Sequence, residues 1–544
     1  MASSRPQLVL DVETLQEEEP AKKRARWRQL CPQADLVDKR TTMIDGDGTD
    51  VPAGPSDAHS AVHWASDSLR MLQVLSKKHF GIDFSKHLTD IMRKGLAIRT
   101  DYSGIGTAEL AAAHIAKAVE AQEDIRAKLI VQRAGDMNHR CREVLQHHSE
   151  LSRPGCVHKD MLERMPERLM KRLKRLHARH LIQVKQRIGK GEKKSEVYNN
   201  QGRKFMRQAV KFVFQDNVHV SEVVAHCEVH DKDCAVLPGL PKKLKAAMVG
   251  NIAGVNCYDW SSMGAMMKWL GPSVFAFLCW ARERVLARQQ EQFAIVECVI
   301  GFDDEFLAEI FDGHFSLTTL RITPTMLGDP IQRHRKYMIL FSDSSKLQWH
   351  PSILKFGSPQ AAFEKLFARN IIMDCDERLR APAEDIASNH KVLAVRRGMP
   401  EVRRSGRNWT GFQILTPALK TAVRFHEQVI QENEGTLKNP YVVNLHQSPN
   451  YVRTNRGVAS ALLRTSRLWS VNKRRLLHPL EYLELQGLNI WDNDEFQCEF
   501  ASALRQLSER QVRQMAGNAM HLRVVGVAIM FCLACSQQQR SKRN

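Results

Sequence analysis

The stretch from Gly95 to Gln122 places the tightest limit on the fold of this chain. Residues Gly95–Asp101 read as a short strand, Tyr102–Thr107 as a glycine-containing turn, and Ala108–Gln122 as an alanine-rich amphipathic helix. A strand, a glycine-rich turn and a helix in this order are typical of the opening unit of a nucleotide-binding α/β domain, because glycines let the backbone approach a ligand at the helix N-terminus. Glu109 fills the third glycine position of the dinucleotide fingerprint, so the pattern predicts an α/β domain without that fingerprint.

Two acidic turns follow this unit. A second predicted strand, Ala127–Ala134, ends at Asp136, and Asp160 follows another short turn. An acidic residue at the end of the second strand is placed to accept hydrogen bonds from ribose hydroxyls. The alternative is that Asp136 caps the next helix, Asn138–Leu145. Three polar turns in succession favour one bound nucleoside.

The charge of the chain indicates its class of partner. The 544 residues carry a formal net charge of +20, which favours polyanions and above all nucleic acid. Residues 161–211 hold sixteen Lys and Arg against four Asp and Glu, a net charge of +12. Their apolar residues have helical spacing, so we expect a basic amphipathic helix. It either contacts phosphates, which the overall charge favours, or is a solvated insertion with one packed face.

Two residues further along the chain could carry chemistry. Cys257 lies in a polar loop, Gly254–Ser262, where a following helix start and nearby cations would favour the thiolate. Taken alone, such a cysteine is more often a small packed hydrophobe. Glu297 lies near the end of an apolar strand, Phe293–Val299, where a carboxylate must be solvated, paired or catalytic.

Arg333 and Arg335 precede a predicted strand, Tyr337–Phe341. Because alternate residues of a strand face the same side, we expect both side chains to reach one anionic site.

The twelve cysteines form no regular framework, which suits a reducing compartment. Donors in the segment His226-Cys227-Glu-Val-His230-Asp-Lys-Asp-Cys234 could hold zinc, but their spacing fits no standard template. We therefore expect a solvated loop there and no metal site. The pair Cys532 and Cys535 lies in an apolar helix pattern and indicates core packing.

No apolar run approaches the roughly 20 residues of a membrane span, and the first thirty residues contain no apolar signal segment. We expect no membrane partner. The basic run at residues 22–28 could be a nuclear import signal. If the run is an import signal, the protein is expected in the nucleus. If it is not, the protein is expected in the cytoplasm.

In their order along the chain, these motifs resemble those of the cytosine-5 DNA methyltransferase family. Forty residues separate the cysteine at the nucleophile motif from the glutamate at the Glu-Asn-Val motif. The resemblance covers about residues 95–340 and 474–535. The matching segments are Asp101-Tyr-Ser-Gly-Ile-Gly106, Asp136, Asp160, Cys257, Glu297, Gln332-Arg-His-Arg335, Arg475–Gly487 and Gly517-Asn518-Ala519.

The chain departs from the family pattern at three places. The nucleophile motif reads Asn256-Cys257-Tyr258 where the family has Pro-Cys-Gln. Cys298 replaces the asparagine of Glu-Asn-Val, and Tyr102 replaces a phenylalanine of the first motif. The losses of proline and of the asparagine amide remove groups that rigidify or brace the loop.

The resemblance implies a Rossmann-like α/β methyltransferase domain, a mixed sheet flanked by helices, with a smaller target-recognition domain. It also implies S-adenosylmethionine as cofactor and cytosine C5 of DNA as the methylated atom, through a covalent bond from Cys257 to C6 of a flipped base. Glu297, Arg333 and Arg335 would stabilise the base and the thiolate. The implied cofactor residues are Asp101, Tyr102, Ser103, Gly104, Gly106, Asp136, Asp160, Asn518 and Ala519.

The resulting expectation is a monomer divided into five parts. They are a disordered tail at 1–60, a catalytic domain at 61–340 with a basic insertion at about 161–245, a recognition domain at 341–473, a return to the catalytic domain at 474–535, and a tail at 536–544. Two alternatives remain. The substrate could be RNA, as in the transfer-RNA branch of the family, or the chain could be a decayed scaffold that only binds nucleic acid.

Overall fold

The structure is a computed structural model that describes residues 51–215, 218–241, 244, 247–261, 264–399, 411–449, 455–492 and 496–539. The basic run at 22–28, most of the predicted N-terminal tail, and residues 540–544 lie outside the described residues. Residues 58–62 form helix α3 (Ala58–Val62). Residues Ser536–Gln538 form strand β14, which pairs with β10 (Leu347–Trp349).

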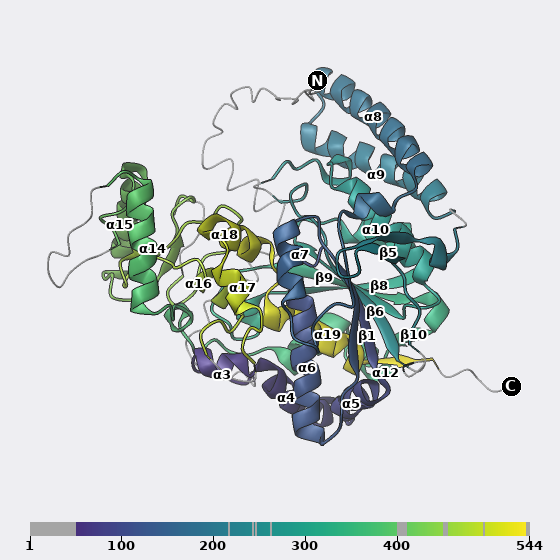
Figure 1. Ribbon diagram of the computed structural model, residues 1–544, viewed down its shortest axis with the longest axis horizontal. Helices are drawn as coiled ribbons and strands as arrows, with labels where there is room; N and C mark the ends of the chain where they lie inside the picture. Colours follow the sequence, from purple (N-terminus) through teal and green to yellow (C-terminus); the bar gives the residue numbers. More distant parts are fainter. Residues whose placement is uncertain are drawn as a thin grey trace.

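A nine-stranded sheet forms the centre of the molecule, in the order β5-β4-β3-β2-β1-β6-β7-β9-β8 (Figure 1). Strands β3, β2, β1, β6 and β7 run parallel to one another, and β9 runs antiparallel between β7 and β8. This mixed sheet, flanked by helices, confirms the predicted Rossmann-like α/β fold. The strands are β1 Leu96–Asp101, β2 Leu129–Gly135, β3 Cys156–His158, β4 Val224–Cys227, β5 Lys232–Ala235, β6 Met248–Gly254, β7 Phe293–Val299, β8 Phe315–Ile322 and β9 Arg335–Ser342.

Alternate residues of the central strands enter two different apolar clusters. In β7, Phe293 and Ile295 belong to one cluster, and Ala294 and Val296 belong to the other. This period of two is what a sheet covered on both faces requires. The first cluster contains residues of α4 Trp64–Phe80, α5 Phe84–Lys94, α6 Thr107–Glu123, α13 Pro359–Phe367 and α19 Leu522–Ala534, and the second those of α8 Glu167–Gly189, α9 Lys194–Val213, α10 Val274–Ala287 and α11 Asp304–Phe311.

Helix α19 and the preceding α18 (Glu509–Asn518) form an apolar stretch long enough to cross a membrane. However, 89% of its most apolar window is buried inside the protein, as in the core helix of a globular domain. Within α19, a Cβ atom added at Gly526 would lie 2.0 Å from the ring of Trp64. The glycine therefore lets helix α4 pack directly against the backbone of α19.

We predict that Gly526→Ala destabilises the fold despite the better helix propensity of alanine. Overpacking a core costs about 1–3 kcal/mol, whereas alanine gains only about 1 kcal/mol over glycine in a helix interior. Urea unfolding should therefore show a net loss of stability. Gly189→Ala in α8 is the control, because nothing lies within 4 Å of its added Cβ. Equal stability of the two variants would contradict this packing.

Helices α8 and α9 form the basic insertion, which packs beside α10 (Figure 1). The buried residues of α8 are Leu169, Leu173, Leu176, His180 and Val184. Ion pairs from α9 to the neighbouring loop and to α11 fix its position: Arg203 with Asp303 at 2.7 Å and Arg207 with Glu309 at 2.5 Å. One face of the insertion is therefore packed, as expected for an amphipathic helix.

A smaller unit lies at one end of the molecule, around α14 (Ala383–Arg396) and α15 (Pro417–Glu434) (Figure 1). Its three-stranded sheet has the order β11-β12-β13, with β11 Val442–Asn444, β12 Leu468–Ser470 and β13 Arg475–Leu476. Its apolar cluster contains buried residues between 393 and 476. Residues 347–379 instead pack into the first cluster of the large sheet, so the packing favours a boundary after residue 379 over the predicted one at 341.

The remaining short helices are α7 His139–Gln146, α12 Pro351–Lys355, α16 Glu481–Glu484 and α17 Ala501–Arg505.

Candidate active site

The turns after β1 and β2 are joined by hydrogen bonds at the carboxyl edge of the sheet. The backbone N–H of Ser103 donates to the carbonyl of Gly135, and the N–H of Gly135 donates to Ser103 Oγ, both at 3.0 Å. The N–H of Gly104 donates to Asp136 Oδ2 at 2.9 Å. Gly104 has a φ of 58°, and an added Cβ would meet nothing within 4 Å. This turn therefore borders open space beside an acidic side chain.

Asp136 does not cap the next helix, which was the alternative that the sequence left open. Its Oδ1 accepts from the N–H of Asn138 at 2.8 Å, and Asn138 is itself the N-cap of α7, with its side chain accepting from the N–H of Arg140 at 3.1 Å. Burial raises the pKa of its carboxyl group, while the donors from Asn138 and Gly104 act to lower it. The half-buried Asp160 caps a short 3-10 helix, with Oδ1 accepting from the N–H of Leu162 at 2.9 Å. Both acids lie after neighbouring parallel strands, β2 and β3.

Gly106 meets a protein side chain. Its φ is 85°, and an added Cβ would lie 2.4 Å from the ring of His148. That ring contacts the carbonyl of Ile105 through Nε2 at 2.9 Å and stacks on Phe500 with centroids 4.3 Å apart. A glycine is thus required at this position for packing against His148. The contact of Gly106 with the cofactor stays a prediction.

Asp101 lies inside the protein. Its carboxylate accepts two hydrogen bonds from Arg133, at 2.6 and 3.0 Å, and one each at 2.9 Å from Arg164 and Asn251. The residue is 0% exposed. Asp101 was predicted to contact the cofactor, and the structure corrects this prediction. Protein donors already occupy its carboxylate oxygens, so Asp101 instead holds the end of β1 in the interior.

Glu109 is a second buried acid beneath the same turn. It accepts a hydrogen bond from Thr100 Oγ1 and is 0% exposed. Burial raises the pKa of Glu109 to about 7, although the hydroxyl groups of Thr100 and Ser103 oppose the shift. The folded state thus favours the protonated form.

This shift predicts a pH-dependent effect of Glu109→Gln. Because the folded-state pKa is raised, the stability contributed by Glu109 is complete below about pH 4.5 and is lost as the pH rises through about 7. The neutral glutamine escapes this loss, so the variant should gain stability over the wild type between pH 5 and pH 8. Glu143→Gln at an exposed ion pair is the control. Parallel pH profiles of wild type and Glu109→Gln would contradict the shift.

The loop that carries Cys257 is tied to the end of β7. Gly254 and Glu297 are register partners in β6 and β7, and the N–H of Val255 donates to the carbonyl of Glu297 at 3.2 Å. Cys257 follows two residues later and is half-buried. Its carbonyl accepts from the N–H groups of Trp260 and Ser261 at 3.0 and 2.9 Å, which closes a turn. The sheet register therefore places the Cys257 loop beside Glu297.

The departures from the family motif have local roles. Asn256 Oδ1 accepts from the N–H of Tyr258 at 3.0 Å, so the residue in place of proline shapes the turn with a side-chain hydrogen bond. The buried Cys298 Sγ lies 3.9 Å from the carbonyl of Val255, where it can act as a weak donor. Burial raises the pKa of the Cys298 thiol well above its usual value, and the nearby Cys257 and Glu297 act in the same direction. The loop is braced, but by different groups.

Glu297 pairs with Arg335, with 2.8 Å between Oε1 and the guanidinium Nε. The side chains are 8% and 16% exposed. An added Cβ at Gly254 would lie 2.9 Å from Met520 Cε, 3.5 Å from the carbonyl of Tyr102 and 3.8 Å from Glu297 Oε2. Segments from the first, middle and last motifs therefore meet at this point. Sequence spacing did not identify Met520, which directly follows the last motif.

Arg333 plays a different part from Arg335, which corrects the expectation of one shared site. Its guanidinium donates to the carbonyls of Ala519, Gly517 and Leu462 at 2.6, 3.4 and 3.5 Å. It thereby holds the last motif in place. Asn518 is exposed and Ala519 is buried.

The environment of Arg333 also shows how near the other groups lie. Burial lowers the pKa of Arg333 to about 10, with Arg335 acting in the same direction and Glu297 and Cys257 opposing it. Arg335, Glu297 and Cys257 therefore all lie close enough to Arg333 for their charges to act on it.

The outer face of α8 is the most basic helix surface of the insertion. Its exposed cationic residues are Arg168, Lys171, Arg172, Lys174, Arg175, Arg179 and Lys185. Some have local partners, since Lys171 pairs with Glu167 at 2.7 Å. A row of exposed cations on one helix is the electrostatic feature that phosphate backbones bind.

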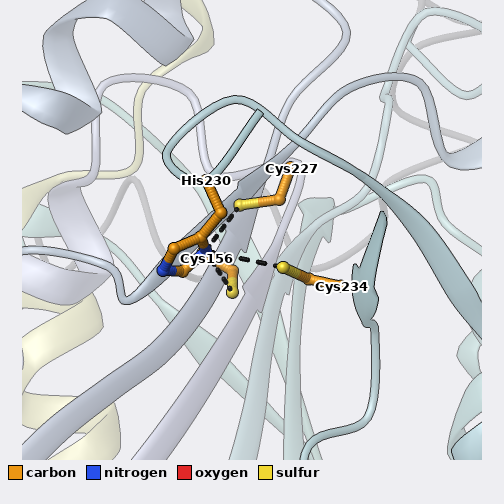
Figure 2. A group of neighbouring side chains, drawn as sticks. All are labelled: Cys156, Cys227, His230 and Cys234. Atoms are coloured by element: carbon orange, nitrogen blue, oxygen red, sulfur yellow. Dashed lines mark hydrogen bonds between the residues drawn. The ribbon is translucent and has the colours of Figure 1, made fainter. Parts of the chain in front are cut away.

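The segment from His226 to Cys234 differs from the expected solvated loop. It forms the hairpin of β4 and β5 at the edge of the sheet, and three of its donors converge with Cys156 of β3 (Figure 2). Sequence reasoning missed Cys156, which lies 74 residues before His230. The spacing of the segment does not point to Cys156, because the two are brought together only by the pairing of β3 with β4.

Comparisons with known proteins found no matching family model and no matching curated protein. Among solved structures, the chain is similar to a predicted DNA modification methyltransferase encoded within an E. coli prophage (12% identity, TM-score 0.37), to the S. pombe Dnmt2 methyltransferase (11%, 0.36) and to the Entamoeba histolytica methyltransferase EhMeth (10%, 0.35). Each covers 80% of this chain and 98% of its own length. Because these values are low, the fold assignment rests on the strand order alone.

Proposed function

We propose that this chain is an S-adenosylmethionine-dependent methyltransferase that modifies C5 of cytosine in DNA. The observation that carries the proposal is the register of β6 and β7, which sets the Cys257 loop beside Glu297. Arg335 pairs with that glutamate, and the charges of Cys257 and Glu297 both act on Arg333. A thiol, a carboxylate and a guanidinium group that holds the carboxylate are residue types that suit covalent activation of a pyrimidine.

The carboxyl edge of the sheet fits the cofactor. The open space beside Gly104 adjoins Asp136, and Asp160 follows the next strand. Carboxylates at these strand ends can accept hydrogen bonds from ribose hydroxyls and from an adenine amine. The methionine part would lie towards Tyr102 and the Cys257 loop. When bound, S-adenosylmethionine supplies an electrophilic methyl carbon.

The residues of the chain would act in the following way. The Cys257 thiolate forms a bond to C6 of the cytosine, and the electron pair of the C5–C6 double bond then makes C5 nucleophilic. Glu297 accepts hydrogen bonds from the exocyclic amine and from the proton that N3 takes up from water as charge develops on the ring. Arg335 keeps the glutamate side chain in position. After methylation, the C5 proton passes to water, and the C5–C6 double bond re-forms as the thiolate leaves C6.

The basic surface supplies the binding energy for the nucleic acid. A cytosine inside a duplex hides C5 and C6, so the base must leave the stack before Cys257 can reach it. Exposed cations on α8 would contact phosphates, and the smaller unit of α14 and α15 would contact base edges.

Methyl transfer from labelled S-adenosylmethionine tests this function. The full-length protein is incubated with duplex DNA and, separately, with total RNA, and the labelled nucleoside is identified after digestion. We expect 5-methylcytosine from the DNA. Label in RNA alone would overturn the DNA assignment, and label in neither would favour a scaffold that binds nucleic acid without catalysis.

A further inference from the structure

Four side chains of residue types that can bind a metal converge near one edge of the large sheet (Figure 2). His230 Nδ1 lies 3.7 Å from Cys156 Sγ, 3.4 Å from Cys227 Sγ and 3.5 Å from Cys234 Sγ. All four donor atoms lie within 4.8 Å of one another. Figure 2 shows the three sulfur atoms arranged around the ring nitrogen.

Hydrogen bonding alone does not account for this convergence. A ring nitrogen carries either one proton or one lone pair, so Nδ1 can form one good hydrogen bond and not three. Tetrahedral zinc gives a direct explanation: with Zn–S about 2.3 Å and Zn–N about 2.0–2.1 Å, the sulfur and nitrogen ligands are about 3.5–3.6 Å apart. The three observed separations lie around that value.

The four donors come from two parts of the chain that little else holds together. Cys156 belongs to β3, whereas the other three lie in or beside the turn of the β4–β5 hairpin. Between β3 and β4 the register contains a single pair, His158 with Cys227. Further bonds run from the N–H of Glu228 to the carbonyl of Val157 at 2.9 Å and between His158 Nδ1 and the carbonyl of His226.

Apolar burial around the hairpin is small. Its cluster contains the buried residues Val223, Val236 and Leu237, together with Ala287 of α10. Such a cluster is much smaller than those on the two faces of the large sheet. Small units with little core commonly depend on a metal or a disulfide for their fold.

We propose that Cys156, Cys227, His230 and Cys234 bind one zinc ion in a closed structural site. Thiolate and imidazole donors suit zinc and disfavour magnesium and calcium, which prefer oxygen. Four protein ligands leave no open position, so the ion has a structural role and no role in catalysis. It joins the β4–β5 hairpin to β3, the outermost of the parallel strands of the large sheet.

The ion also supports the turn that carries Asp136. Glu228, in the hairpin turn, pairs with Arg142 Nε at 2.9 Å. Arg142 Nη1 in turn donates to the carbonyls of Asp136 and Met137, both at 2.9 Å. Removing the zinc would free the hairpin turn and, through this pair, loosen the residues that follow β2.

Metal analysis of the full-length protein tests the site. Protein purified without chelators from zinc-supplemented medium should contain one zinc per chain by elemental mass spectrometry. The double variant Cys227→Ser/Cys234→Ser should lose it, whereas His226→Ala should keep it, because His226 lies in the same hairpin but outside the cluster. Wild-type protein without zinc, with iron in its place, or a double variant that retains zinc would overturn the proposal.

A second measurement uses the wild-type chain, so it does not depend on the folding of a variant. Zinc is removed with a chelator and replaced by Co²⁺, whose visible absorption distinguishes tetrahedral thiolate from octahedral oxygen coordination. We expect the tetrahedral spectrum. Amide hydrogen exchange should become faster at residues 224–235 and 136–142 on zinc removal and stay unchanged in α19. An octahedral spectrum, or exchange that does not respond to zinc removal, would contradict the site.

Discussion

Replacing Cys257 with serine is expected to reduce methyl transfer to DNA by on the order of 10³-fold or more, because a hydroxyl group is a far weaker nucleophile than a thiolate. The loss should appear in kcat, while binding of S-adenosylmethionine and DNA changes little. The half-buried side chain packs against the second apolar cluster, and serine keeps its approximate size. The measurement is the initial rate of label transfer at saturating DNA.

Two controls separate chemistry from structure in this experiment. The variant should unfold at the same temperature as the wild type within a few degrees. Cys532→Ser, in the buried core helix α19, should retain the Cys257-dependent reaction in the fraction that remains folded. Transfer by Cys257→Ser at the wild-type rate would exclude the proposed nucleophile.

Replacing Asp101 with asparagine is expected to destabilise the fold by about 3–5 kcal/mol, because it removes the nearer of two buried carboxylates that pair with Arg133 and Arg164. Among the described residues, only Glu283, at 3.3 and 3.4 Å, then remains for two buried guanidinium groups. Burial acts to raise the pKa of Asp101, but Arg133 and Arg164 outweigh it and hold the pKa far below its ordinary value. Because the pKa is lowered in the folded state, this stabilisation is present at neutral pH and is lost only as the pH falls well below 4.

Asp90→Asn is the matched control, since Asp90 forms an ion pair with Arg93 on the surface with about half of each side chain exposed. Exposed pairs contribute about 0–1 kcal/mol, so the control should unfold like the wild type. Urea unfolding at pH 7 compares the two. If Asp101→Asn weakened cofactor binding without changing stability, Asp101 would be a cofactor contact after all and its interior role would be wrong.

The strands and helices with clear apolar periodicity could be predicted from the sequence. The opening unit was expected at Gly95–Asp101 and Ala108–Gln122, and the structure has Leu96–Asp101 and Thr107–Glu123. Strand Phe293–Val299 has the predicted bounds. In each case the type of element follows from the spacing of apolar residues along one short segment. A spacing of 2 residues indicates a strand, and a spacing of 3.6 residues indicates a helix.

The parts that could not be predicted depend on distant residues. Asp101 lies in the interior because Arg133, Arg164 and Asn251, from three other segments, surround it. Arg333 and Arg335 do not share one strand face, because strand β9 begins at Arg335 and Arg333 lies in the preceding loop.

The β4–β5 hairpin escaped prediction for a related reason. Its sequence is polar, and apolar alternation marks a strand only where one face is buried. At this edge of the sheet, Cys227 is the one fully buried residue of the two strands.

Trapping with DNA that contains 5-fluorocytosine tests whether Cys257 bonds to C6 of the target base, because fluorine at C5 cannot leave as a proton does and the bond from Cys257 to C6 therefore persists. With S-adenosylmethionine present, wild-type protein should form a covalent complex that survives denaturing electrophoresis, and peptide mapping should locate the bond at Cys257. The Cys257→Ser variant should form none. A folded, DNA-binding wild-type protein that leaves no adduct, or an adduct that maps to another residue, would contradict the account.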